Sequence, residues 1–131
     1  MKKIGILNSE ISRVISTLGH TDQIVICDAG FPIPSHVERI DLSLTPGLPS
    51  FQTTLETVLI ELKPERVYFA EEIRQANPTV LKQIDKALGD IEQKSVPHDE
   101  LKRMSHQAKA VIRCGECTRY ANVILQAGVI F

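Results

Sequence analysis

Two polar residues flank a short apolar run near the start of the chain, and both are of types that can do proton-transfer chemistry. Gly19-His20-Thr21-Asp22 precedes the run Gln23–Cys27, and Asp28-Ala29-Gly30 follows it. Imidazole suits general acid–base work because its ordinary pKa of about 6.5 keeps both forms populated near neutrality. A carboxylate at the carboxyl end of a strand stands where α/β sheets bind ligands. The alternatives are a solvated loop histidine at 20 and a turn-capping aspartate at 28, and the residue types alone do not choose between them.

The other three histidines differ in what their surroundings predict. His98, Lys102 and His106 are spaced i, i+4, i+8 and so share one helical face. His98 and His106 would lie about 12 Å apart along the axis, too far to hold one metal ion. His98 follows Pro97 at a helix start, where free backbone N–H groups favour oxygen-rich ligands. We therefore interpret His106 as part of a solvated face and His36 as a surface loop residue, and we keep His98 as a candidate for a ligand contact.

Motifs for bound cofactors are missing. The seven glycines form no Gly-x-Gly and none precedes Lys-Ser/Thr, so the dinucleotide and P-loop signatures are absent. No Gly-x-Ser-x-Gly elbow occurs either. Cys114-Gly-Glu-Cys117 is a single C-x-x-C that leads into an apolar strand rather than a helix, and it has no second ligand pair. We expect two ordinary thiols at a turn, and an activity that needs no cofactor or metal.

Composition excludes several classes of protein. The 131 residues include 15 basic and 16 acidic side chains with a net charge of −1 and no basic block, so nucleic acid is not an expected partner. The start, MKKIGILNSEISR, holds a four-residue apolar stretch broken by Gly5, too short for a signal peptide or a membrane span. Three cysteines, an odd number, suggest free thiols in a reducing compartment. We expect a cytoplasmic protein without membrane insertion.

These residues need a scaffold, and the apolar periodicity predicts one. Helices are expected over Glu10–Leu18 after a cap at Asn8 or Ser9, from a cap at Ser50 to Leu62, between Asn77-Pro78 and Gly89, and over Pro97–Gln107. Strands are expected at Gln23–Cys27, Val37–Leu44, Arg66–Ala70, Asp90–Val96, Lys109–Arg113 and within the apolar Ala121–Phe131. The alternation predicts a single α/β domain over residues 1–131, a layered sheet with helices packed on its faces, Rossmann-like but without a dinucleotide motif. Because the apolar run Val123–Phe131 reaches the last residue, we also expect an obligate oligomer that covers it.

Several blocks of the sequence resemble the ribose pyranase family, which also contains the fucose mutarotases. They are Leu7-Asn-Ser-Glu-Ile11, Leu18-Gly-His-Thr-Asp22, Cys27-Asp-Ala-Gly-Phe-Pro-Ile-Pro34, Ala70-Glu-Glu-Ile73, Ile112-Arg-Cys-Gly-Glu-Cys-Thr-Arg-Tyr-Ala-Asn122 and Gln126-Ala-Gly-Val-Ile-Phe131. The blocks are co-linear and run from Met1 to Phe131. The resemblance is closer to the ribose enzymes than to the fucose enzymes.

The resemblance implies a cofactor-free isomerase that interconverts the β-pyranose and β-furanose forms of D-ribose and so supplies furanose to a ribokinase. It implies a homodecamer of two stacked pentameric rings, with sites between neighbouring subunits. In such a family the histidine at the position of His20 is the proton donor. Sugar contacts would come from Asp28, His98, Lys102, Tyr120, Ala121 and Asn122. Alternatives are fucose mutarotase-type anomer exchange, a non-catalytic sugar-binding accessory of a ribose transporter, and a structural oligomer.

Overall fold

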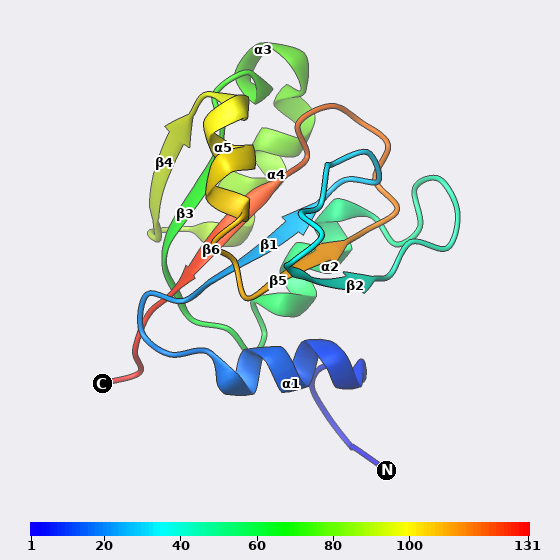
Figure 1. Cartoon of the computed structure of the whole chain (residues 1–131), viewed down its shortest axis with the longest axis vertical. Coiled ribbons are helices and arrows are strands. Elements are labelled where there is room, and N and C mark those ends of the chain that lie inside the picture. The colour runs from blue at the N-terminus through cyan, green and yellow to red at the C-terminus, as the bar shows by residue number, and fades with distance from the viewer.

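The computed structural model describes all 131 residues and is built around one six-stranded mixed sheet (Figure 1). The strands lie in the order β2-β5-β1-β6-β3-β4, and β6 runs antiparallel to both of its neighbours while the other pairs are parallel. Their bounds are β1 Gln23–Cys27, β2 Glu38–Asp41, β3 Pro64–Ala70, β4 Glu92–Val96, β5 Ala110–Arg113 and β6 Val123–Ala127. The predicted α/β layered fold is confirmed, and the antiparallel β6 at its centre is a departure from an all-parallel sheet.

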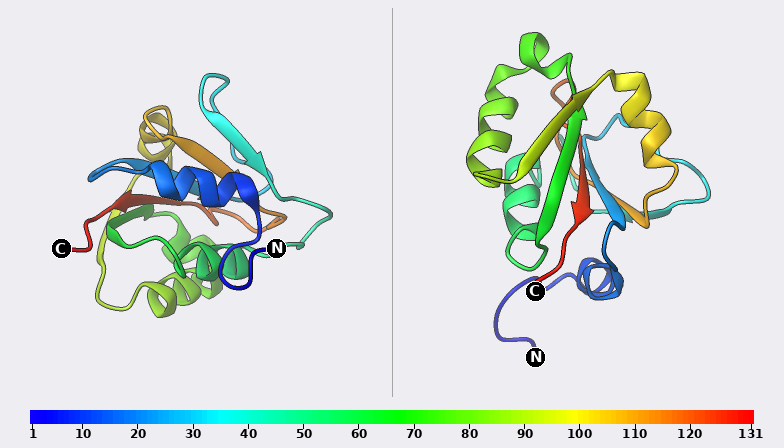
Figure 2. Two further views of the ribbon diagram at one scale, coloured as in Figure 1. Left: turned by 90° about the horizontal axis from the view of Figure 1, so that it is seen from below. Right: turned by 90° about the vertical axis from the view of Figure 1, so that its left-hand side faces the viewer.

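Helices cover both faces of this sheet. The right-hand view of Figure 2 shows α2 (Phe51–Val58) and α4 (Pro78–Leu88) on one face and α5 (His98–Ser105) on the other. The first helix, α1 (Ser9–Thr17), lies at the end of the sheet where β1 begins, and the short α3 (Ile73–Ala76) precedes α4. None of these helices has both the length and the apolar character needed to cross a membrane.

The alternation of side chains along the strands builds two cores. In β1, Ile24 and Ile26 join the larger cluster under α2 and α4, whereas Val25 and Cys27 join the smaller cluster that includes Leu101 of α5. A strand that is buried on both faces needs apolar residues throughout, which is why Gln23–Cys27 has no hydrophilic side. Fully burying each such side chain contributes about 1.5–3 kcal/mol. The strand between His20 and Asp28 is thus held rigidly on both sides.

The helix starts follow the predicted capping residues. The side chain of Asn8 accepts from Ile11 N at 2.9 Å, and that of Ser50 accepts from Thr53 N at 3.0 Å. Asn77 accepts from Val80 N at 3.3 Å, with Pro78 in the first turn of α4. Each cap satisfies a backbone N–H that the helix itself cannot pair.

Two predicted elements end several residues before the predicted boundary, and one short helix was not predicted. The helix expected to reach Leu62 ends at Val58, because the next turn tightens to bonds such as Glu61 N to Val58 O. The strand expected over 37–44 pairs only at Glu38–Asp41, and α3 had no prediction. The apolar run near the last residue is mostly β6, which is buried between β1 and β3, so only Ile130 and Phe131 remain exposed. The run is therefore explained by the sheet, and it is not by itself a reason to expect an oligomer.

Candidate functional site

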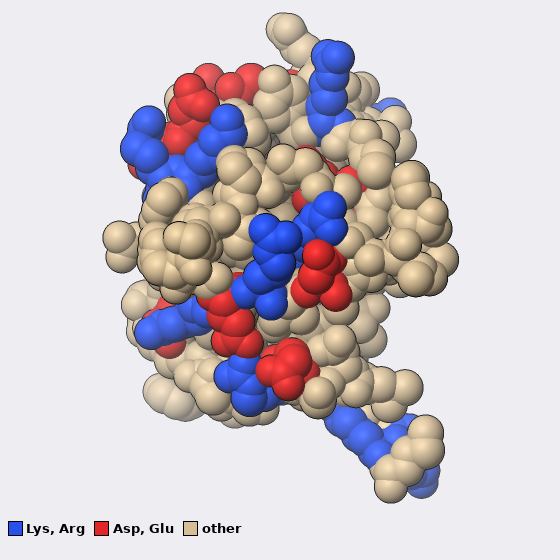
Figure 3. Space-filling model, turned by 45° about the vertical axis from the view of Figure 1, so that its right-hand side comes forward, with Lys and Arg blue, Asp and Glu red and all other residues tan.

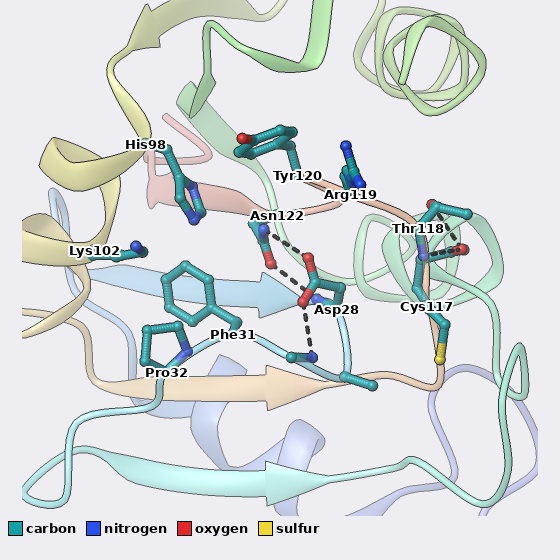
Figure 4. A pocket seen from close by; sticks show the side chains of 13 residues that line it. Asp28, Phe31, Pro32, His98, Lys102, Cys117, Thr118, Arg119, Tyr120 and Asn122 are labelled. Carbon is teal, nitrogen blue, oxygen red and sulfur yellow. Dashed lines mark hydrogen bonds between the residues drawn. The ribbon is translucent and has the colours of Figure 1, made fainter. Parts of the chain in front are cut away.

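A cavity of about 590 Å³ opens at the carboxyl edge of the parallel strands. Its walls come from the loop after β1, the start of α5, and the segment that links β5 to β6 (Figure 4). This edge is where the topology of an open α/β sheet places ligand sites. The lining includes Asp28, Phe31, His98, Lys102, Glu116, Arg119, Tyr120 and Asn122. Five of the seven predicted site residues line this one cavity.

Asp28 and Asn122 form a reciprocal pair at the floor of the cavity. Asn122 Nδ2 donates to Asp28 Oδ2 and Asp28 N donates to Asn122 Oδ1, each at 2.9 Å, while Gly30 N donates to Asp28 Oδ1 at 2.9 Å. These bonds fix the orientation of the amide and leave it one further N–H. Burial raises the pKa of the Asp28 carboxyl, against the smaller lowering effects of Gly30 and Asn122. The pair is a rigid group of acceptors and donors for hydroxyls.

His98 stands at the first residue of α5, where the sequence predicted it. Its backbone N–H donates to both carboxylate oxygens of Glu72, at 3.0 and 3.1 Å. Its ring points into the cavity and lies edge-on to Tyr120 at 5.0 Å and to Phe31 at 6.1 Å between centroids (Figure 4). Burial, and then the charge of Lys102, lowers the pKa of His98, so the neutral ring is favoured. Its buried Nδ1 has no hydrogen-bond partner in the chain, which suits a ligand hydroxyl.

The segment between β5 and β6 supplies the remaining predicted contacts. Tyr120 has φ +59°, an uncommon backbone conformation for a bulky residue, and its carbonyl accepts from Asn122 N at 2.8 Å. Ala121 is fully buried in the larger core and does not line the cavity, unlike its neighbours Tyr120 and Asn122. Lys102 lines the cavity from α5, and its Nζ lies 3.3 Å from Asp99 Oδ1. The strained segment is held by Asn77, whose Nδ2 donates to Thr118 Oγ1 and Arg119 O.

His20 is not among the residues that line this cavity. It lies in the loop that joins α1 to β1, at the end of the sheet where β1 begins (Figure 1). Thr21 N donates to Ala127 O at 2.9 Å, so His20 is next to the last residue of β6, whereas Asn122 precedes its first residue. Five strand residues span about 16 Å. His20 Nε2 instead meets Glu65 Oε2 at 2.8 Å. Within one chain the structure therefore brings together Asp28, His98, Lys102, Tyr120 and Asn122, but not His20.

Residues that the sequence interpretation gave no role also reach the cavity. Phe31, Arg119 and Glu116 line it, and Glu72 caps the helix that carries His98. Phe31 follows Asp28 within one short block, which is a signal that could have marked it. Glu72 is 26 residues from His98 and only the fold joins them. All three cysteines are free, and burial raises the pKa of Cys114 to about 11, so the protonated thiol is favoured there.

The polar groups of the cavity suit a small ligand rich in hydroxyls. Carboxylate, amide, imidazole and phenol groups surround it, and its basic side chains are matched by acidic ones. On the face shown in Figure 3, basic and acidic side chains are likewise interspersed. No group of three or more His, Cys, Asp or Glu side chains is placed to hold a metal ion. The arrangement can bind an uncharged polyol and exchange protons with it.

Known proteins resemble this chain over its whole length. Residues 1–130 match the model of the RbsD / FucU transport protein family. The chain is 56% identical to the D-ribose pyranase of Laribacter hongkongensis and 53% identical to that of Actinobacillus pleuropneumoniae, with 100% of both chains covered in each case. The solved structure of Bacillus subtilis RbsD complexed with D-ribose matches with a TM-score of 0.97 at 50% identity over 100% of both chains. The fucose mutarotase of Streptococcus pneumoniae, at 20% identity over 95% of each chain, shares the fold with a TM-score of 0.78. The predicted resemblance is thus confirmed, and the chain belongs to the RbsD / FucU transport protein family.

Proposed function

We propose that this protein is a D-ribose pyranase, an isomerase that interconverts the β-pyranose and β-furanose forms of D-ribose without a cofactor. The observation that carries the proposal is the hydroxyl-binding cavity around Asp28 and Asn122 in a chain about half identical to proteins named D-ribose pyranase. The likeness to a ribose complex of the same fold supports the same substrate.

The chemistry of ring exchange fits the residues at hand. The hemiacetal must open, the open chain must rotate, and another hydroxyl must close on C1. Opening needs a proton on the ring oxygen and the loss of one from the anomeric hydroxyl, which is work for general acids and bases. In our proposal Asp28, His98, Lys102, Tyr120 and Asn122 hold the sugar, and the imidazole of His20 delivers the proton.

This assignment requires more than one chain at each site. A pentose is too small to touch both ends of β6, so a sugar at Asn122 cannot reach His20 of the same chain. A neighbouring copy that brings its own His20 to the cavity would complete the site. Closed rings form when one surface of each copy meets a different surface of the next. We propose such a ring, assembled as a decamer of two pentamers and located in the cytoplasm.

Saturation-transfer NMR on free sugars tests the proposed function. The wild-type protein should speed exchange between the pyranose and furanose signals of D-ribose and do so less well between the anomers of L-fucose. A sugar-binding accessory would broaden the lines without speeding exchange, and a structural protein would do neither. Either of those two results would overturn the proposal, and faster exchange on L-fucose would replace the substrate.

A further inference from the structure

The side chain that contacts His20 is Glu65, whose carboxylate does not line the cavity. Glu65 Oε2 lies 2.8 Å from His20 Nε2, and the two side chains are 34% and 55% exposed. In β3, Pro64 pairs with Ala127 and Arg66 with Gln126, so Glu65 is an extra residue in a β-bulge. Bulges re-aim side chains and are common beside active sites. Here the bulge directs a carboxylate to the imidazole.

A buried amide fixes the orientation of this carboxylate. Gln126 is 8% exposed, and its Nε2 donates to Glu65 Oε1 at 2.7 Å. Its Oε1 accepts from Gln23 Nε2 at 3.2 Å and from Tyr68 OH at 3.4 Å, so the amide cannot turn round without losing these bonds. The bonds from Gln126 and then His20 lower the pKa of Glu65, which keeps it ionised near neutrality. A carboxylate can only accept, so His20 Nε2 must carry the hydrogen.

The backbone around His20 is equally constrained. Thr21 N donates to Ala127 O at 2.9 Å, Ala127 N donates to Asp22 O at 2.8 Å, and Gly19 N donates to Asp22 Oδ2 at 2.9 Å. Thr21 has φ +70°, a conformation that β-branched residues rarely adopt. Such strain persists where the surroundings over-determine it, and it clusters at functional sites. These bonds fix the backbone on both sides of His20 and so restrict the positions that its side chain can take.

We propose that Glu65 is a positioning residue that holds His20 in the Nε2–H tautomer, so that Nδ1 is the atom that exchanges the proton with the sugar. The inference rests on the proposed role of His20 as proton donor. In ring opening the acid is the imidazolium, protonated on both nitrogens: it gives its Nδ1 proton to the ring oxygen while the bond from that oxygen to C1 breaks and leaves its electron pair on the oxygen, and the ring remains as the neutral Nε2–H tautomer. The anomeric hydroxyl loses its proton to solvent as C1 becomes a carbonyl. In closure, a hydroxyl adds to C1, the carbonyl oxygen takes a proton from solvent, and the hydroxyl proton returns to Nδ1.

The tautomer can be measured directly on the wild-type protein. Long-range ¹H–¹⁵N correlation at pH 8.5, where free imidazole is neutral, should show His20 protonated at Nε2 and bare at Nδ1. A neutral ring protonated at Nδ1 overturns the proposal. This measurement needs no variant and no activity.

Kinetics of matched variants provide the second test. Glu65→Gln should lower kcat by about tenfold or more and leave ribose affinity within about twofold, because a neutral imidazole that carries its hydrogen at Nδ1 binds sugar no worse but has no lone pair there to take up the proton in ring closure. Glu65→Asp, which keeps a carboxylate, should recover part of that loss. Glu92→Gln is the control: it removes a neighbouring carboxylate that pairs with Arg66 and does not touch His20, so kcat should stay at the wild-type value.

The outcomes separate this inference from the proposed function. If His20→Ala loses the rate and Glu65→Gln matches wild type, the positioning role is wrong and the proton donor stands. If His20→Ala exchanges ribose as fast as wild type, the proposed mechanism fails, and this inference fails with it. If Glu65→Gln weakens ribose binding as much as turnover, Glu65 acts on the sugar rather than through His20, which also overturns the inference.

Discussion

Burial moves two titratable side chains of the cavity in opposite directions. It raises the pKa of the Asp28 carboxyl and lowers that of the His98 imidazole, so both shifts favour the uncharged form. A side chain whose charged form is disfavoured in this way costs less free energy to desolvate when an uncharged sugar covers it. The cavity can therefore offer strong hydrogen-bonding groups to a ligand at a lower desolvation cost than that of two fully charged buried side chains.

The shift at His98 has a consequence for stability. Because the folded protein holds the pKa of His98 below the ordinary value, the unfolded chain binds a proton there more readily. The contribution of His98 to stability is therefore present above about pH 6.5 and lost as the pH falls through its folded value. We predict that His98→Gln loses less stability than wild type between pH 7 and pH 5. Urea denaturation of both proteins across that range measures the difference, and parallel pH profiles would refute the prediction.

Substitution of His20 should separate chemistry from binding. His20→Ala should reduce the rate of ribose ring exchange by about 10²–10⁴-fold, the usual contribution of a general acid. Affinity should change by no more than about 0.5–1.5 kcal/mol, the net value of one hydrogen bond. Asn122→Ala should weaken binding alongside turnover, because it removes the partner of Asp28 and the contact that we propose for a sugar hydroxyl. NMR exchange gives the rates and calorimetry the affinities. His20→Ala that neither binds nor reacts would make His20 a sugar contact instead.

At the scale of elements, Asn77 couples a helix to the wall of the cavity. Its Oδ1 caps α4 while its Nδ2 holds Thr118 and Arg119. Asn77→Ser keeps a good cap but loses both anchoring bonds, so we expect a loss of about 1–2 kcal/mol in stability. Ribose binding should weaken as well, since the anchored segment leads directly into Tyr120 and Asn122. Chemical denaturation and calorimetry give the two values.

The matched control for this prediction is the first helix. Asn8 caps α1 through the same kind of bond, to Ile11 N, and its side chain has no anchoring role. Asn8→Ser should therefore leave both stability and ribose affinity nearly unchanged, because both residues are good caps. Equal losses in the two variants would mean that the cap, and not the anchor, accounts for the effect at Asn77.

The sequence predicted elements well where local signals were strong. Gln23–Cys27 matched residue for residue because an unbroken apolar run between turn residues has few other uses. The helix Pro78–Leu88 matched because Asn77, Pro78 and Gly89 mark both of its ends. The direction of β6 was not predictable in this way. Parallel and antiparallel strands of a buried sheet carry the same apolar residues, so only tertiary pairing decides.

Site residues were likewise predictable from the sequence only where a local signal marked them. Asp28 and His98 could be named because each stands at the end of a recognisable strand or helix. Glu65 could not, because 45 residues separate it from His20 and a bulge in β3 aims it there. His20 and Asp28 are close in the sequence because they flank one strand. The length of that strand nevertheless places them at opposite ends of the sheet. That separation became visible only in three dimensions.

At the scale of the whole molecule, the shared site makes a prediction about mixed assemblies. If Asp28 and His20 at one sugar come from different chains, co-expression of His20→Ala with Asp28→Ala rebuilds intact sites at random. About a quarter of the sites should then contain both residues, and about that share of the wild-type rate should return. Each variant alone should remain impaired. Co-purification through two different tags and NMR exchange on ribose make the measurement.

Two outcomes of that experiment would contradict the shared site. If mixing restores nothing although mixed particles form, the two residues do not meet across an interface. If light scattering at micromolar concentration finds particles of 14.6 kDa, the mass of one chain, no assembly exists to share a site. A stable particle of about ten chain masses is the result that we expect from a double pentameric ring.

The position of β6 also has a consequence for how the protein is made. It is the last of the six strands of this sheet to be synthesised, yet it lies between β1 and β3 at the middle of the sheet. Until it emerges from the ribosome, the chain can form only two separate blocks, β2-β5-β1 and β3-β4, each with an open apolar edge. At 5–20 residues per second, roughly 5–20 s pass between the synthesis of β1 and that of β6. During that interval the nascent chain exposes two unpaired strand edges, so wrong strand pairing and aggregation compete with folding until β6 emerges.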